Sequence, residues 1–119
     1  MTRIALLAAG LVTALALAAP VSGTSQATRL KGTVGPGFTI TLKKGTAPVR
    51  SLKAGSYTIT VQDKSNIHNF RLRGPGVNRQ ITTVAFRGSK TVTLRLRKGS
   101  YTYVCDPHVS NMKKTFRVT

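Results

Sequence analysis

The stretch Tyr57-Thr58-Ile59-Thr60-Val61-Gln62 alternates apolar and polar side chains one residue at a time. Successive side chains of an extended strand point to opposite faces, so this pattern predicts a strand with one buried face and one wet face. Thr and β-branched residues dominate the stretch, as strands prefer. The same period recurs in 38–43, 92–97 and 115–118, and no stretch of residues 28–119 shows a sustained helical period.

Turns that contain glycine separate these alternating runs. They lie at Gly35-Pro36-Gly37, Lys43-Lys44-Gly45, Lys53-Ala54-Gly55, Gly74-Pro75-Gly76, Arg87-Gly88-Ser89 and Lys98-Gly99-Ser100. Short alternating runs between regularly spaced turns are typical of antiparallel sandwiches and barrels. The sequence therefore predicts an all-β domain of seven or eight strands.

The first 27 residues differ from the rest of the chain and predict an export signal. Arg3 gives a basic start, Ile4–Ala19 is sixteen residues without a charge, and Ser25-Gln26-Ala27 has the small-x-small pattern of a cleavage site. The alternative is an uncleaved membrane anchor, but the apolar run is shorter than the roughly 20 residues that span a bilayer. We therefore expect an exported protein whose single domain is residues 28–119.

The charge of the chain is strongly positive. It has 19 Lys and Arg against two Asp and Glu, a formal net charge of +17, and loss of Arg3 with the leader would leave +16. Two acids argue against paired-carboxylate hydrolysis. A single Cys forms no internal disulfide, zinc ribbon or iron–sulfur cluster. Few aromatic residues and no nucleic-acid motif argue against a nucleic-acid partner.

The alternation also assigns faces to two reactive side chains. His68 shares its phase with Phe70 and Leu72, so it is predicted to point into the core. Arg71 and Arg73 fall on the opposite phase and are expected to face water. Cys105 shares its phase with Tyr101 and Tyr103, so it too is predicted to point inward from the end of a strand.

Residues 28–119 contain four side chains that suit a soft or borderline metal: His68, Cys105, His108 and Met112. Two imidazoles, a thiolate and a thioether form the set expected at a mononuclear blue-copper site. The thiolate binds Cu(II) strongly and the thioether suits Cu(I), whereas zinc does not favour thioethers. Each residue alone would more often be a core residue, but together they exhaust the soft ligands of this part of the chain and predict one copper ion.

On these residues the chain resembles the cupredoxins, the plastocyanin and azurin superfamily. The resemblance rests on His68-Asn69, on Cys105-Asp106-Pro107-His108 with Met112, and on a final strand in 113–118. It implies an eight-stranded Greek-key sandwich with copper at one end. His68, Cys105 and His108 would be equatorial ligands and Met112 the axial ligand. It also implies outer-sphere electron transfer through the exposed edge of His108. Independently of the resemblance, the place of Asn69 beside His68 predicts hydrogen bonds from its backbone or side chain to the Cys105 loop.

The leading interpretation is an exported, monomeric, non-enzymatic carrier of single electrons. Its positive charge favours an acidic redox partner, an anionic lipid or an anionic cell-wall polymer, although a solvated surface is the simpler reading. A protein that stores or delivers copper without an electron-carrier role would use nearly the same ligands. An apo structural or adhesive sandwich is the third alternative. Four protein ligands leave no open position for a substrate, which argues against an enzyme.

Overall fold

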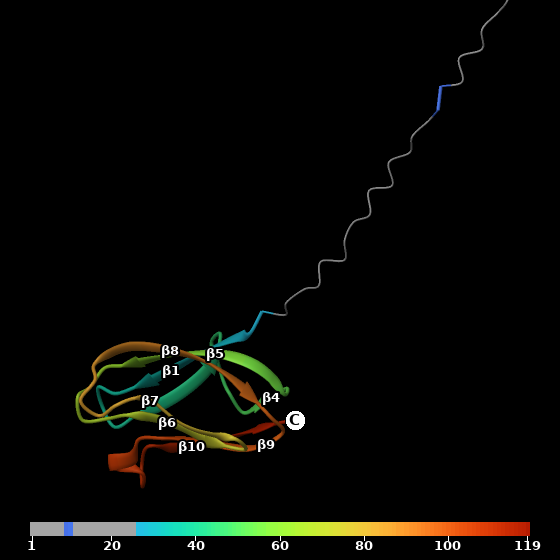
Figure 1. The fold of residues 1–119 in the computed structure, drawn as a ribbon. Coiled ribbons are helices and arrows are strands. Elements are labelled where there is room, and N and C mark those ends of the chain that lie inside the picture. The colour runs from blue at the N-terminus through green and yellow to red at the C-terminus, as the bar shows by residue number, and fades with distance from the viewer. Residues whose placement is uncertain (1–8, 11–25) are drawn as a thin grey trace, which may run out of the picture.

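The computed structural model describes residues 9–10 and 26–119. The described chain forms two five-stranded sheets that face each other across one apolar core (Figure 1). The first sheet has the order β3-β2-β1-β5-β8. Its strands are β1 (Thr28–Val34), β2 (Ile40–Lys44), β3 (Ala47–Pro48), β5 (Gly55–Asp63) and β8 (Gly88–Leu96).

The second sheet has the order β4-β10-β9-β6-β7 and supplies most of the frame around the candidate site. Its strands are β4 (Ser51–Leu52), β6 (Phe70–Gly74), β7 (Val77–Thr82), β9 (Gly99–Val104) and β10 (Lys113–Val118). One short 3-10 helix, η1 (Asp106–His108), lies between β9 and β10. The all-β sandwich predicted from the sequence is confirmed.

Two details differ from the antiparallel arrangement that we expected. The sheets are mixed, because β1 pairs in parallel with β5 and β4 pairs in parallel with β10. After β1 the chain passes through β2 and β3 in the same sheet and through β4 in the opposite sheet, so it returns as β5 in the direction of β1. Ten strands form in all among the described residues, but β3 and β4 have two residues each, which leaves eight longer strands.

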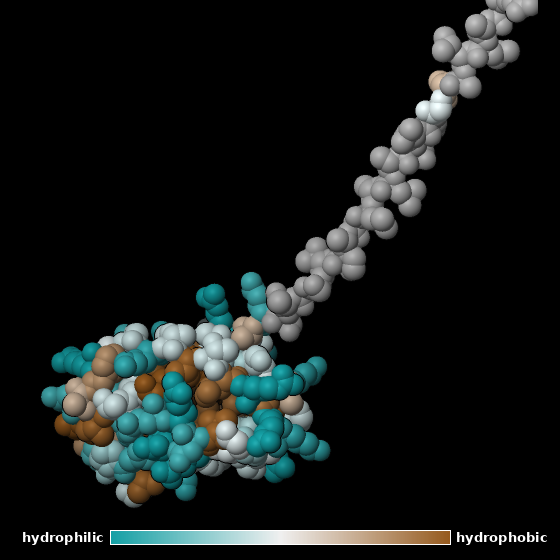
Figure 2. Space-filling model, in the orientation of Figure 1, coloured by the Kyte–Doolittle hydropathy of each residue, from teal (hydrophilic) through white to brown (hydrophobic). Residues whose placement is uncertain are grey.

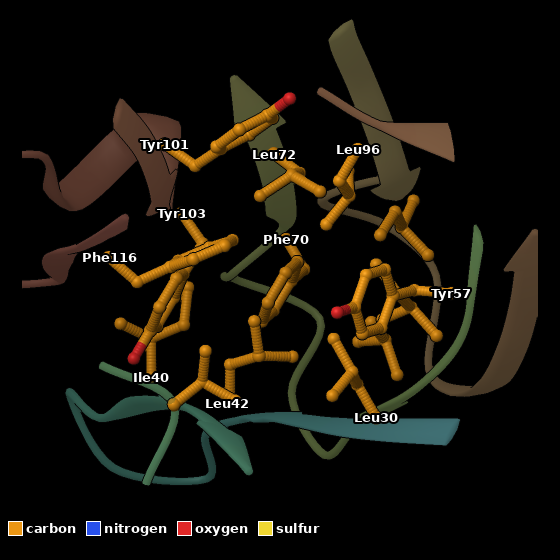
Figure 3. Packing of buried hydrophobic residues seen from close by; sticks show 14 of the residues in the cluster. Leu30, Ile40, Leu42, Tyr57, Phe70, Leu72, Leu96, Tyr101, Tyr103 and Phe116 are labelled. Atoms are coloured by element: carbon orange, nitrogen blue, oxygen red, sulfur yellow. The ribbon is translucent and has the colours of Figure 1, made fainter. Parts of the chain in front are cut away.

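The core is filled by the inward phase of the alternating strands. In β5, Tyr57, Ile59 and Val61 are at most 5% exposed, as the two-residue period predicts. The aromatic rings of the second sheet stack on one another, with Phe70 and Tyr103 parallel to within 2° at a centroid distance of 5.6 Å (Figure 3). Offset ring pairs of this kind stabilise a core beyond the area that they bury.

The two poles of the sandwich differ in what they carry. Thr28 and Thr119 line one hollow, so the start of β1 and the end of the chain share a pole. The turn between β9 and β10 lies at the other pole, at the left of Figure 1. The predicted export signal falls almost wholly outside the described residues and stays a prediction. Within the ranges that the structure describes, no helix is long and apolar enough to cross a membrane.

Candidate metal centre

His68 and Cys105 are brought together by the pairing of two neighbouring strands. β6 and β9 run antiparallel with Arg71 opposite Val104. The residues that precede β6 and follow β9 therefore meet at the same end of the sheet. His68 and Cys105 are both 0% exposed, which confirms the inward positions that the alternation predicts.

His108 reaches the same place because the chain turns sharply after Cys105. Pro107 occupies the first turn of η1, where its missing N–H is not needed. The amide of His108 donates to the carbonyl of Cys105 at 3.0 Å, and the amide of Cys105 donates to the carbonyl of Met112 at 3.0 Å. These bonds close the neck of the segment 105–112, which we call the ligand loop.

The three donor atoms form a small triangle. His68 Nδ1 lies 3.1 Å from His108 Nδ1, and Cys105 Sγ lies 3.6 Å from the first nitrogen and 3.5 Å from the second. The centre of such a triangle is about 2.0 Å from each atom, which is close to the length of metal–nitrogen and metal–thiolate bonds in proteins. The residues present therefore fit a metal ion bound by all three side chains.

Met112 is buried in the core, with 1% of its surface exposed. Its amide donates to the carbonyl of His108 at 2.8 Å, and its carbonyl accepts from Cys105. The backbone of Met112 thus closes the ligand loop on both sides. Its role as the axial ligand stays a prediction.

A polar network beside the triangle ties the ligand loop to β6 and β7. Asn69 Oδ1 accepts from the amide of Asp106 at 2.7 Å, while Asn69 Nδ2 donates to Asp106 Oδ2 at 2.8 Å and to Gln80 Oε1 at 3.0 Å. Asn69 is 0% exposed. The second-shell hydrogen bonds expected of Asn69 are therefore present, and the loop is held by a side chain as well as by its own backbone.

Arg71 lies on the outward face of β6, as the alternation predicts, but it is only partly exposed. Its side chain lies over the sheet, and Nε donates to Asp106 Oδ2 at 2.8 Å, while Arg73 approaches Asp106 Oδ1 at 3.5 Å. Burial acts to raise the pKa of Asp106, but the hydrogen bonds from Arg71 and Asn69 and the two guanidinium charges outweigh it and hold the pKa below 3.8. The single acid of the loop therefore pairs with a cationic side chain of the outward face, a contact that the alternation alone does not predict.

The electrostatics at the Cys105 thiol oppose its ionisation. Burial raises its pKa above 9.0, and the charges of Asp106 and Asp63 add to this effect. The backbone N–H groups of Asn69 and His108 act in the opposite direction. These two amides would hydrogen-bond a thiolate, so the site offers some stabilisation of the form that binds a metal.

Asp63 is a member of the site region that the sequence interpretation missed. The segment reads as a turn, yet Asp63 ends β5 and is 1% exposed. Its Oδ1 accepts from the amide of Ser65 at 3.1 Å, whereas its Oδ2 and His68 Nε2 are both buried without a hydrogen-bond partner. Burial raises the pKa of Asp63 above 3.8. The burial of Asp63 could have been predicted from the sequence, because Asp63 continues the inward phase of Tyr57 and Ile59.

Phe38 is the second residue whose place differs from the sequence expectation. The alternation of Phe38, Ile40 and Leu42 predicts an inward ring, but β2 begins at Ile40 and Phe38 is 56% exposed. Its ring meets His68 edge-on at 5.3 Å and His108 edge-on at 4.9 Å between centroids. The preceding Gly35 has a positive φ of 73°, which lets the loop turn and carry Phe38 over the two imidazoles.

An apolar patch surrounds the site on the outside. Phe38, Ile67 and Val109 are 56%, 47% and 54% exposed, and they are three of the four large hydrophobic residues that are exposed in the described chain. Phe38 contacts both imidazoles, while Ile67 precedes His68 and Val109 follows His108.

Comparisons with known proteins identify the fold. No protein-family model matches the sequence, and no curated protein is similar to it. Among solved structures, a rusticyanin variant is similar with a TM-score of 0.57 and 20% identity over 76% of each chain. Rusticyanin from Thiobacillus ferrooxidans gives 0.53 and 18% over 76% of each chain. Reduced rusticyanin gives 0.55 and 20% over 76% of this chain and 78% of that chain.

Proposed function

We propose that this chain, which has the fold of rusticyanin and the other cupredoxins, binds one copper ion as a type 1 centre and carries single electrons between redox partners. The observation that supports this most is the triangle of His68 Nδ1, His108 Nδ1 and Cys105 Sγ, with sides of 3.1–3.6 Å. Two imidazoles and one thiolate in a trigonal set are the donors of blue-copper sites. A copper ion held there would supply a one-electron couple between Cu(II) and Cu(I).

In this proposal His68, Cys105 and His108 would hold the copper ion, and Met112 would supply a fourth, weaker donor. A fixed donor set that suits both oxidation states favours electron transfer, because little rearrangement accompanies the change of charge. The hydrogen bonds between Asn69 and Asp106 and the closed neck of the ligand loop would keep the donors in place. The ring of Phe38 lies edge-on against both imidazoles and would limit the access of water from that side.

The apolar patch of Phe38, Ile67 and Val109 would be the surface through which partners approach His108. Electron-transfer complexes use small interfaces that form and break quickly. The surrounding surface is cationic, because both acids of the chain are engaged inside the protein or with arginine. We therefore propose that the redox partner is acidic around its own docking patch, since such charge complementarity accelerates the encounter.

The proposal makes the protein a carrier and not an enzyme. Three protein donors with Met112 as a fourth would complete the coordination of the ion and leave no position for a substrate. A store or carrier of copper itself remains the competing function, because it would use the same ligands. Electron self-exchange measured by NMR line broadening distinguishes the two, because fast exchange is expected only of the electron carrier.

The test is to add one equivalent of Cu(II) to the purified protein and record visible absorption and electron paramagnetic resonance. We expect an intense thiolate-to-copper charge-transfer band and narrow hyperfine splitting. Cys105→Ser should abolish the band, and Ser110→Ala, an exposed change in the same loop, should leave it in place. A wild-type protein that binds stoichiometric copper and stays colourless would contradict the proposal.

Export is part of the proposal and rests on the composition of residues 1–27. β1 begins at Thr28, the residue that follows the predicted cleavage site. We therefore propose that the mature protein starts there and works outside the cytoplasm. Mass spectrometry of the protein recovered from its native host should give a chain that starts at Thr28, and a chain that retains its first 27 residues would exclude cleavage.

A further inference from the structure

The outer face of the first sheet carries a cluster of hydroxyl groups, most of them on β5 and β8. Directly paired residues of a sheet point to the same side, so the register places three pairs of threonines on this face: Thr33 beside Thr41, Thr58 beside Thr93, and Thr60 beside Thr91. The last two pairs are hydrogen-bonded through their hydroxyls at 3.2 Å and 3.0 Å. Two serines and a glutamine continue the same face.

The remaining outward positions of β1, β2, β5 and β8 are cationic: Arg29, Lys31, Lys43 and Arg95. All four are exposed. Lys31 lies directly opposite Lys43, so two like charges meet on neighbouring strands. Directly opposed like charges destabilise a sheet, and a bound anion between them would remove that repulsion.

No acid compensates these cations in the described part of the chain. Asp63 is buried, and Asp106 is paired with Arg71 and Arg73 on the other sheet. The arginines on the outward face of the second sheet therefore have Asp106 as a counterion, whereas the cations on the outward face of the first sheet have none. In Figure 2 hydrophilic and near-neutral colours predominate along the upper edge, where β8 and β5 lie in Figure 1.

We propose that this face, built on β1, β2, β5 and β8, binds an anionic polysaccharide. Lysine and arginine would bind its acidic groups, and the threonine hydroxyls, which both donate and accept, would bind its hydroxyls. An extended polymer matches an extended flat surface. The face presents no apolar side chain at these positions to insert into a bilayer, and no aromatic anchor of the kind that holds a protein interface.

This face lies away from the surface through which we propose that redox partners approach. The face lies along the side of the sandwich, whereas His108 and the apolar patch lie at one pole, in the loops that follow β1, β5 and β9. A protein molecule that is bound to the polysaccharide through β1, β2, β5 and β8 therefore keeps its patch of Phe38, Ile67 and Val109 accessible to a redox partner. The binding itself needs no metal, so it stands or fails separately from the copper proposal.

The first test measures binding of the purified full-length protein to polygalacturonate at low salt by calorimetry. We expect Lys31→Gln with Lys43→Gln to weaken binding about 20-fold, as the loss of two charges close to a polyanion would. The matched control, Lys53→Gln with Lys98→Gln, removes the same charge from exposed turns and should weaken it less than about threefold. Equal losses in the two variants would overturn the proposal, because they would reflect net charge alone.

The second test removes hydroxyls without changing charge. Thr60→Val with Thr91→Val keeps two β-branched residues that strands favour and should weaken polygalacturonate binding about fivefold, as the loss of one or two hydrogen bonds would. Unchanged affinity would overturn the role of the hydroxyls. Tighter binding to phosphatidylglycerol vesicles or to double-stranded DNA than to polygalacturonate would overturn the choice of partner. Circular dichroism of each variant confirms that it is folded.

Discussion

The two segments that supply the donor atoms each carry one of the chain's two acids, and they treat that acid in opposite ways. In the segment 63–69, Asp63 is enclosed at the end of β5 with one oxygen unpartnered, and its pKa is raised. In the ligand loop, Asp106 lies at the surface among Asn69, Arg71 and Arg73, and its pKa is lowered. An aspartate therefore destabilises the fold in the first segment and stabilises the loop in the second.

The difference shows how the two halves of the centre are held. His68 lies between β5 and β6 and is fixed by the packed core of both sheets. The ligand loop has no strand of its own between Cys105 and Met112. It depends on its backbone bonds and on the side-chain network around Asp106. Changes to that network should therefore affect the loop more than changes at Asp63 affect His68.

The largest effect is expected from the residue that joins the two segments. Asn69→Ala leaves the amide of Asp106 without its acceptor and opens a small cavity in a fully buried position. We expect the free energy of unfolding to fall by about 3 kcal/mol. Denaturant titration of the copper-free protein measures it. Gln80→Ala, which loses one exposed partner of Asn69, is the matched control and should cost less than about 1 kcal/mol.

A smaller loss is expected at the acid of the ligand loop. Asp106→Asn removes the charge that faces Arg71 and should lower stability by about 1.5 kcal/mol at pH 7. Because the folded-state pKa of Asp106 lies below 3.8, its stabilisation is present above pH 3.8 and is lost as pH falls through the folded-state pKa. Thermal melts from pH 2 to pH 7 should show this acid loss in the wild type and not in the variant.

Arg73→Gln tests which of the two arginines, Arg71 or Arg73, contributes more to stability through Asp106. Arg73 is 56% exposed and 3.5 Å from the carboxylate, so its removal should change stability by less than about 0.5 kcal/mol. A loss as large as that of Asp106→Asn would show that the carboxylate is held by charge from both arginines and not mainly by the close hydrogen bond from Arg71.

An effect of the opposite sign, a gain in stability, is expected at Asp63. Asp63→Asn removes a buried charge and keeps an acceptor for Ser65, so stability at pH 7 should rise by about 1 kcal/mol. Because the folded-state pKa of Asp63 is raised, the wild type should be stabilised by protonation below pH 3.8 and lose that stabilisation as pH rises through the folded-state pKa. Melts of the two proteins should therefore converge in acid, and a gap that widens there would contradict this assignment.

Much of the site could be predicted because it depends on patterns within the sequence. The two-residue period placed His68 and Cys105 on inward positions, and the short spacing from Cys105 to His108 allowed a single turn to bring them together. The convergence of His68 with that loop, 37 residues away, required the pairing of β6 with β9. No local pattern specifies which strands become neighbours.

The sequence by itself determined the all-β class, the buried phase of β2, β5, β6, β8, β9 and β10, and the short list of metal donors, because alternation and residue type act locally. Only the tertiary structure decided the parallel pairing of β1 with β5, the exposed place of Phe38 over the imidazoles and the contrasting surroundings of the two acids. These features depend on which groups from distant strands come within a few ångströms. Contacts of that kind set the dielectric, the charge and the hydrogen bonds that each side chain meets.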